Sequence, residues 1–194
     1  QLKANGQKNL KQNKTNKKFI YLISPNKILD INFYDDLALV FSSKKISFFQ
    51  LRLKKETNLN KLIIGKKIRK ICNKYKVKFL INDDPLLAKK LNADGCHLGQ
   101  KDMDLIKARK ILKNKIIGVT CHNSINLAKR AIKDGADYLA FGAFYATKTK
   151  TVKYRASLTV LKSIKKITSL PIVAIGGIKL NNYKKLLLNK ANFL

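Results

Sequence analysis

The sequence predicts an α/β protein whose parallel strands close into a (β/α)8 barrel of the TIM type. Short apolar runs typical of strands alternate with longer segments of helical periodicity, and such alternation is typical of a parallel sheet. Eight strand-like runs occur, the number that this barrel needs. An open doubly wound sheet is the alternative, but no Gly-x-Gly-x-x-Gly motif follows the first strand, which weakens a dinucleotide-binding fold.

The predicted strands are short, and helical patterns fill the gaps between them. Strands are expected at 19–23, 46–51, 78–81, 95–98, 116–120, 138–141, 171–175 and from near Phe193 onward. Helices are expected at 62–75, 105–112, 125–134, 158–167 and 183–188. A complete barrel of this type has roughly 200 residues or more, whereas this chain has 194. We therefore expect the barrel to be incomplete at its C-terminal end, without most of strand eight, its loop and its helix.

Length and composition indicate one domain. A chain of 194 residues, 45% of them hydrophobic, can bury one sizeable core. We assign residues 19–194 to the barrel domain and expect the polar, basic stretch 1–18 to be a disordered tail. No apolar stretch is long enough to span a bilayer, and no signal segment opens the chain. The protein is therefore expected to be soluble and cytoplasmic, without a membrane partner.

The charge is strongly positive. The net charge of +31 comes from 42 Lys and Arg against 11 Asp and Glu, and such a field attracts polyanions, so a basic module that binds nucleic acid is an alternative. The lysines are spread along the chain without an interleaved aromatic platform and match no nucleic-acid module. We interpret most of this charge as solvated helix surface and predict no specific nucleic-acid partner.

The three cysteines argue against a disulfide framework. Cys72, Cys96 and Cys121 are odd in number, lie far apart and form no Cys-x-x-Cys pair. The pairs Cys96-His97 and Cys121-His122 could hold zinc if their strands were neighbours, but adjacent strand residues point to opposite faces. His97 and His122 are candidate general bases, and a hydrogen-bonded structural role is the alternative for both.

An anion clamp is predicted after the second strand. Gln50, Arg52 and Lys54 share one face of an extended segment, while Leu51 and Leu53 share the other, because strand side chains alternate with period two. An amide, a guanidinium and an ammonium at the C-terminal tip of a barrel strand suit an anionic substrate. We interpret this face as half of a diphosphate site.

Two carboxylates are candidate metal ligands. Asp83 and Asp102 follow the third and fourth predicted strands, which are neighbours in a barrel. Mg²⁺ is held by one or two carboxylates, with water and substrate phosphate completing its shell. The alternative is that both residues cap the following helices. The nearby clamp favours the metal.

Two later loops carry candidate phosphate contacts. Lys150 lies beside Thr147 and Thr149 in a segment without hydrophobic anchoring, and such a loop can close over a substrate and bring a cation to a leaving group. Gly176-Gly177 follows the seventh strand, where barrels often bind phosphate through backbone N–H groups. A tight strand-to-helix turn is the alternative for the two glycines.

The order of these motifs resembles the thiamine phosphate synthase family over residues 19–194. The motifs are Gln50-Leu-Arg52-Leu-Lys54, Asn82-Asp83, Ala93-Asp-Gly-Cys-His-Leu-Gly-Gln-x-Asp102, Gly118-Val-Thr-Cys-His122, Gly135-Ala-Asp-Tyr, Thr147-x-Thr-Lys150 and Ala174-Ile-Gly-Gly-Ile178. The stretches Val119-Thr-Cys-His and Ala140-Phe-Gly-Ala-Phe are most similar to the alphaproteobacterial branch.

The resemblance implies a transferase that couples 4-amino-2-methyl-5-hydroxymethylpyrimidine diphosphate with 4-methyl-5-(2-hydroxyethyl)thiazole phosphate, giving thiamine phosphate and diphosphate in thiamine biosynthesis. Carried over, it implies Arg52, Lys54 and Lys150 as catalytic residues and Mg²⁺ on Asp83 and Asp102. The pyrimidine diphosphate would contact Gln50, Arg52, Lys54, Asn82, Thr120 and Lys150, and the thiazole phosphate would contact Thr147, Thr149 and Gly177. A further thiazole-phosphate contact of the family lies after strand eight. The oligomeric state is left open.

A sister activity is the competing interpretation. Thiazole tautomerase is an isomerase on the same barrel that binds only the thiazole phosphate and can use a histidine comparable to His122. It typically lacks the complete diphosphate clamp and the Asn-Asp pair. The presence of Gln50, Arg52, Lys54 and Asn82-Asp83 favours the synthase.

Overall fold

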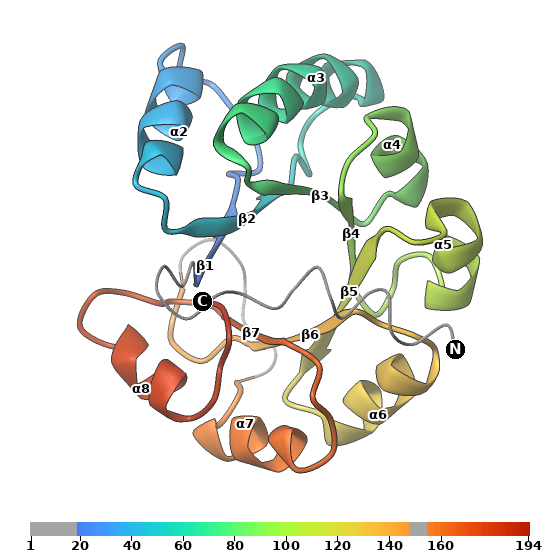
Figure 1. The fold of residues 1–194 in the computed structure, drawn as a ribbon, viewed down its shortest axis with the longest axis vertical. Coiled ribbons are helices and arrows are strands. Elements are labelled where there is room, and N and C mark those ends of the chain that lie inside the picture. Colours follow the sequence, from blue (N-terminus) through green and yellow to red (C-terminus); the bar gives the residue numbers. More distant parts are fainter. Residues whose placement is uncertain (1–18, 148–154) are drawn as a thin grey trace.

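The computed structural model describes residues 19–147 and 155–194, and it shows a barrel of parallel strands inside a ring of helices (Figure 1). Each strand pairs in parallel with the next in the order β1 to β7. The strands are β1 (Ile20–Ile23), β2 (Ile46–Leu51), β3 (Lys78–Asn82), β4 (Gly95–Leu98), β5 (Ile116–His122), β6 (Tyr138–Gly142) and β7 (Ile172–Ile175). The predicted barrel is confirmed, and the open doubly wound alternative is excluded. The expected tail, 1–18, lies outside the described residues.

The helices lie on the outer side of the strands (Figure 1). They are α2 (Phe33–Ser42), α3 (Asn58–Tyr75), α4 (Pro85–Lys90), α5 (Leu105–Leu112), α6 (Ile125–Lys133), α7 (Leu158–Lys165) and α8 (Tyr183–Leu188). Neither α2 nor α4 was predicted from the sequence. The reason for α4 is its length, because six residues give too little periodicity to recognise.

Alternation along the strands divides the apolar residues between two cores. One core fills the barrel interior and consists of Tyr21, Phe48, Leu80, Tyr138, Ala140, Val173 and Phe193. The other lies between strands and helices and includes Leu51, Leu53, Phe79 and Ile81. Leu51 and Leu53 thus face the helices, as the alternation predicted, so Gln50, directly before Leu51, points to the barrel interior, where it is buried.

The same hydrogen-bonding pattern occurs three times at the N-terminal face of the barrel. In each case a side-chain oxygen accepts a hydrogen bond from a backbone N–H at the start of the preceding strand. The acceptors are Asp94, just before β4, Asp137, just before β6, and Asn192, after α8. The bonds run from Phe79 N to Asp94 (2.9 Å), from Ile117 N to Asp137 (2.7 Å) and from Ile172 N to Asn192 (2.9 Å). Each of the three acceptor residues also returns its own N–H to that residue's carbonyl at 2.8 Å. The third repeat places Phe193 where an eighth strand begins.

The last two residues lie between β7 and β1. Phe193 forms a parallel bridge with Val173, and Leu194 accepts from Tyr21 N at 2.7 Å and donates to Phe19 O at 2.9 Å. The expected start of strand eight near Phe193 is confirmed. Among the described residues, no strand joins the remainder of β7 to β1, so the barrel has one open seam.

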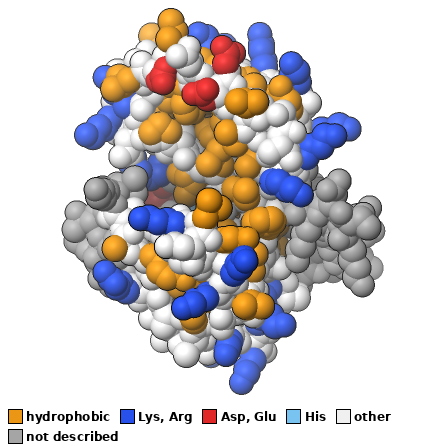
Figure 2. Space-filling model, turned by 90° about the vertical axis from the view of Figure 1, so that its left-hand side faces the viewer, with side chains coloured by type: hydrophobic (Ala, Val, Ile, Leu, Met, Phe, Trp, Pro, Cys, Tyr) orange, Lys and Arg blue, Asp and Glu red, His pale blue; other side chains and the backbone are white. Residues whose placement is uncertain are grey.

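The seam side of the molecule exposes several large apolar side chains. Figure 2 shows this side, where α2 and α8 lie, and a band of hydrophobic side chains runs across it. The exposed large hydrophobic residues on these helices and their flanking loops are Leu29, Ile31, Leu39, Val40, Leu180 and Leu188.

In the part of the chain that the structure describes, no helix combines the length and the hydropathy needed to cross a bilayer.

Candidate active site

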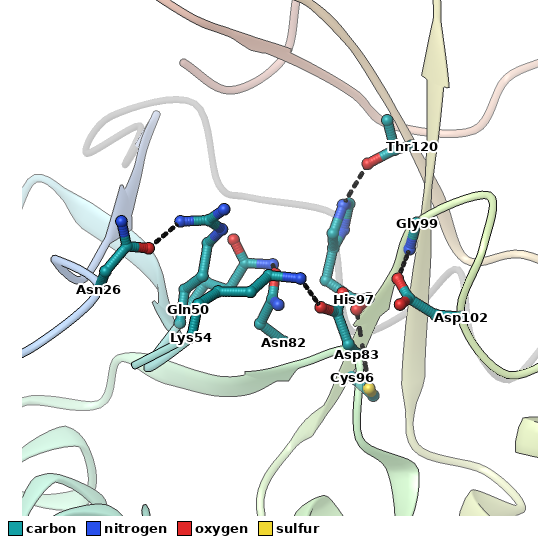
Figure 3. A network of polar contacts seen from close by, with 11 residues as sticks. Asn26, Gln50, Lys54, Asn82, Asp83, Cys96, His97, Gly99, Asp102 and Thr120 are labelled. Atoms are coloured by element: carbon teal, nitrogen blue, oxygen red, sulfur yellow. Dashed lines mark hydrogen bonds and ion pairs between the residues drawn. The ribbon is translucent and has the colours of Figure 1, made fainter. Parts of the chain in front are cut away.

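The predicted site residues in or just after β2, β3, β4 and β5 gather at one end of the barrel, where the strands end. Figure 3 shows Gln50, Lys54, Asn82, Asp83, Asp102 and Thr120 around the barrel mouth. Parallel strands bring these positions together although 70 residues separate Gln50 from Thr120, because all strands point the same way. This rim is therefore the candidate active site.

The anion clamp is held in place by hydrogen bonds from neighbouring elements. Gln50 Nε2 donates to Asn82 Oδ1 at 3.2 Å, which aligns two amides at the ends of β2 and β3. The Arg52 backbone N–H donates to Ser24 Oγ at 2.8 Å, and the Arg52 guanidinium donates to Asn26. These bonds fix both the backbone and the guanidinium of Arg52.

Sequence reasoning missed Ser24 and Asn26. Ser24 follows β1 directly and Asn26 comes two residues later, much as the predicted site residues follow their own strands. A polar pair after an apolar run was therefore the signal that could have found them. They add a contribution from the first strand to a clamp predicted from the second alone.

Asp83 and Asp102 face each other across the rim. Each carboxyl group affects the ionisation of the other, so that the pKa of Asp83 is lowered and that of Asp102 is raised, and Lys54 forms an ion pair with Asp83. Asp102 also accepts from Gly99 N at 2.7 Å. The clamp and the carboxylate pair are thus one continuous cluster (Figure 3).

Helix capping is carried out by two other aspartates. Asp84 accepts from Leu87 N at 2.8 Å and caps α4, while Asp104 accepts from Ile106 N at 2.9 Å and caps α5. The alternative that Asp83 and Asp102 serve as caps is therefore wrong.

The backbone turns sharply at Asp83. Its φ is 65°, in the left-handed region, and Asp84 N donates to Asn82 O at 2.9 Å across it. Asp tolerates this conformation better than most residues. The turn places Asp83 and Asp84 in different directions, so one faces the rim while the other caps a helix.

The two facing carboxyl groups differ in acidity. Burial raises the pKa of Asp102, and the adjacent Asp83 raises it further. Burial also raises the pKa of Asp83, but the interaction with Asp102 and the Lys54 ammonium outweigh it and lower the pKa overall. Two carboxyl groups in contact resist full ionisation unless a cation joins them. The pair can therefore hold either a shared proton or a cation.

Thr120, at the end of β5, lies beside a buried histidine. His97 Nε2 is 2.8 Å from Thr120 Oγ1, and Gln100 Nε2 donates to the Thr120 carbonyl at 2.5 Å. The neighbouring Cys96 packs in the core between strands and helices, on the opposite side of the strand from His97. Adjacent side chains therefore diverge here, as expected from strand geometry.

The second Cys-His pair lies at a bulge. The pairing of β5 with β6 shifts between Thr120 and His122, and His122 has a φ of 52°. Cys121 is buried in the outer core. A bulge redirects the chain at the end of β5, which adjacent sequence positions alone did not reveal.

The loops after β6 and β7 approach each other closely. Tyr145 N donates to Gly176 O at 3.1 Å, and a Cβ on Gly177, where φ is 66°, would lie 2.3 Å from Ala146 O. The absence of side chains on Gly176 and Gly177 thus lets the loop after β6 pack closely against the loop after β7. This packing was not predicted from the sequence. Thr147 is half-buried beside this contact, whereas Thr149 and Lys150 lie outside the described residues.

A sequence model of the family described as "Thiamine monophosphate synthase" matches residues 20–194. The chain belongs to this family. This match confirms the family resemblance that the ordered motifs indicated. It also confirms the expected enzyme class.

Similar proteins support the same family. The chain is 95% identical to the thiamine-phosphate synthase of Pelagibacter ubique over 185 residues, which are 95% of this chain and 89% of that protein. It is 39% identical to the Nitrosomonas eutropha protein of the same name, over 87% of this chain and 79% of that one. A solved structure titled thiamine phosphate pyrophosphorylase, from Pyrococcus furiosus, matches with a TM-score of 0.78 and 30% identity, over 92% of this chain and 84% of that one.

Proposed function

We propose that the protein couples 4-amino-2-methyl-5-hydroxymethylpyrimidine diphosphate with 4-methyl-5-(2-hydroxyethyl)thiazole phosphate and releases diphosphate. The observation that carries this proposal is the continuity of the cationic clamp with the carboxylate pair through the Lys54–Asp83 ion pair. A diphosphate bound together with a divalent cation needs cations and carboxylates side by side. Membership of the thiamine monophosphate synthase family supports these two substrates.

The pyrimidine diphosphate would lie across the barrel mouth. Gln50 and Asn82 present adjacent amides that can bind the polar edge of the ring, and Arg52 and Lys54 face the diphosphate. Thr120 offers a hydroxyl from the far side of the mouth (Figure 3). Lys150, in the loop after β6, would add a third cation to the leaving group.

The rim carboxylates fit a magnesium ion. Asp83 and Asp102 supply the hard oxygen ligands that Mg²⁺ prefers. Asp83 raises the pKa of Asp102, and a positive charge between the two carboxylates would relieve their repulsion. When bound, the ion would neutralise charge on the diphosphate oxygens. Lys54 already compensates part of the charge of Asp83.

The reaction needs charge neutralisation and alignment, without a protein nucleophile. The bond between the pyrimidine methylene carbon and the diphosphate oxygen breaks, the electron pair leaves with diphosphate, and the aminopyrimidine ring stabilises the resulting cation. The thiazole nitrogen then donates its lone pair to that carbon. Arg52, Lys54 and Lys150 would stabilise the departing charge, while Thr147, Thr149 and Gly177 would hold the thiazole phosphate in line.

The test is product formation from both substrates. Purified protein with Mg²⁺ is expected to release diphosphate and form thiamine phosphate, detected by fluorescence after oxidation, only when both substrates are present. Arg52→Ala should reduce the rate by about a hundredfold or more. Lys110→Ala, which removes an equal charge from the exposed face of α5, should leave it unchanged.

Two outcomes would overturn the proposal. Isomerisation of the thiazole phosphate without coupling would assign the protein to the tautomerase activity instead. Full activity in Arg52→Ala would show that the clamp is not the diphosphate site.

A further inference from the structure

A continuous chain of hydrogen bonds runs through the barrel interior to the active-site rim. Tyr21 Oη lies 2.7 Å from Tyr138 Oη, and Tyr138 Oη lies 2.7 Å from His97 Nδ1. His97 Nε2 lies 2.8 Å from Thr120 Oγ1. Tyr21, Tyr138 and His97 are buried, whereas Thr120 is only half-buried. The chain therefore has a closed inner end and an outer end at the rim.

The closed end determines the direction of every bond. Among the described residues, the Tyr21 hydroxyl has only Tyr138 as a hydrogen-bond partner, and a buried hydroxyl proton without an acceptor is costly. Tyr21 must therefore donate to Tyr138, and Tyr138, whose other partner is His97, must donate to His97 Nδ1. A neutral imidazole that accepts at Nδ1 carries its proton on Nε2. Nε2–H then donates to Thr120.

The same geometry requires a neutral His97. If His97 were doubly protonated, Nδ1–H would donate to Tyr138, and one of the two tyrosine protons would be left without an acceptor. Burial raises the pKa of Tyr21 and of Tyr138, so both tyrosines keep their protons.

Packing holds the chain in this geometry. The Tyr138 ring stacks on the His97 ring, with centroids 5.6 Å apart and planes at 22°. A Cβ on Gly118 would lie 1.8 Å from Tyr138 Cζ, so only glycine leaves room for the ring there. The imidazole has little freedom to rotate or flip.

We propose that Tyr21, Tyr138 and His97 are positioning residues that fix the polarity of Thr120. Because Thr120 Oγ1 accepts from His97, its own proton is left to donate at the barrel mouth. This inference rests on the proposed function for its ligand: Thr120 meets a hydrogen-bond acceptor of the pyrimidine diphosphate, a ring nitrogen or a phosphate oxygen. The buried chain thus selects for an acceptor at that point of the substrate.

The direct test is the tautomer of His97 in the ligand-free protein at pH 7. Two histidines occur in the sequence, so long-range ¹H–¹⁵N correlations of tag-free protein should show two ring systems, with that of His122 assigned through His122→Asn. We expect the neutral Nε2–H form for His97. A dominant Nδ1–H form, or an imidazolium, would overturn the proposal. This result does not depend on substrate identity, so it stands or falls separately from the proposed function.

A substitution cycle tests whether the chain acts through Thr120. Tyr138→Phe removes the donor to Nδ1, so the Nδ1–H tautomer should become populated and kcat/KM should fall about tenfold, the typical effect of one lost hydrogen bond. In a Thr120→Val background, Tyr138→Phe should cause no further loss. Tyr75→Phe, at the end of α3, is the matched control and should change neither quantity.

A purely structural role predicts the opposite pattern. Tyr138→Phe would then lower stability without changing the His97 tautomer, and its effect on kcat/KM would add to that of Thr120→Val. Either finding would overturn the positioning role. Thr120→Ser keeps the hydroxyl that Thr120→Val removes. As a single substitution, it is therefore expected to have a kcat/KM close to the wild-type value.

Discussion

Aspartates at the two ends of the barrel have opposite surroundings. At the N-terminal face, Asp94 accepts from Arg69 at 2.5 Å, from Lys78 at 3.3 Å and from Phe79 N at 2.9 Å. At the C-terminal rim, Asp83 has one ammonium, from Lys54, and faces a second carboxyl group. Asp94 is saturated by donors of the fold, whereas the rim pair can still accept a proton or a cation.

The contrast separates stability from function within one residue type. Burial raises the pKa of Asp94, but Phe79 N–H, Arg69 and Lys78 outweigh it and lower the pKa overall. The pKa of Asp83 is also lowered, yet partly at the expense of Asp102, whose pKa is raised. A favourable contact for one rim carboxylate is therefore unfavourable for its neighbour. Such arrangements are typical of functional sites.

The largest expected effect is on catalysis at the rim. Asp83→Asn keeps the shape of the side chain but removes a charge, and we expect thiamine phosphate formation to fall by roughly a hundredfold or more. The free energy of unfolding should change by less than about 1 kcal/mol, because the replaced ion pair is half-exposed and a like-charge contact is relieved. Steady-state rates and urea denaturation of the same preparation check both.

The matched change at the opposite end should show the reverse. Asp94→Asn leaves Arg69 and Lys78 without a carboxylate, and we expect a loss of about 1.5 to 3 kcal/mol of unfolding free energy, the usual range for hydrogen bonds to a charged group. The turnover of the folded fraction should be unchanged. A stable Asp94→Asn variant with impaired turnover would contradict the division between the two ends.

Magnesium should stabilise the protein through the rim alone. A ligand present at ten times its dissociation constant adds about 1.4 kcal/mol to the stability of a protein that binds it only when folded. Thermal unfolding with Mg²⁺ and with EDTA should show this difference in the wild type and in Asp94→Asn. It should be absent in Asp102→Asn, and its persistence there would exclude the carboxylate pair as the metal site.

The smallest expected effect is a pH dependence of stability at the N-terminal face. Because the pKa of Asp94 is lower in the folded protein, its stabilising contribution is complete above the ordinary pKa of about 3.9 and is lost as the pH falls through the folded value. The stability difference between wild type and Asp94→Asn should therefore shrink below about pH 4. Urea denaturation at pH 7 and pH 3 measures it, and a constant difference would contradict the assignment.

Local sequence patterns predicted the barrel well, because its strands are clear apolar runs. They also predicted where the site lies, because charged and polar residues directly follow those runs. The distinction between adjacent aspartates was harder to predict. Asp83 and Asp84 are neighbours in sequence, and only the left-handed backbone at Asp83 decides which one faces the rim. Periodicity contains no information about one such turn.

The interior chain illustrates a second limit. Tyr21 and Tyr138 are 117 residues apart, and His97 lies on a third strand between them. Each residue alone is an ordinary inward-facing strand residue, so their contact depends on closure of the barrel. The histidine was recognised as a candidate for either a base or a structural role, but its partners follow only from the three-dimensional arrangement.

The most direct test of the account is a calorimetric titration of inorganic diphosphate into the protein, with and without Mg²⁺, at physiological salt. The account predicts Mg²⁺-dependent binding at one site that is lost in Arg52→Ala and Asp83→Asn and kept in Lys110→Ala and Asp94→Asn. If the affinity for diphosphate does not depend on Mg²⁺ and falls equally in Arg52→Ala and Lys110→Ala, binding would reflect only the net charge of +31. That result would contradict a diphosphate site at the C-terminal rim.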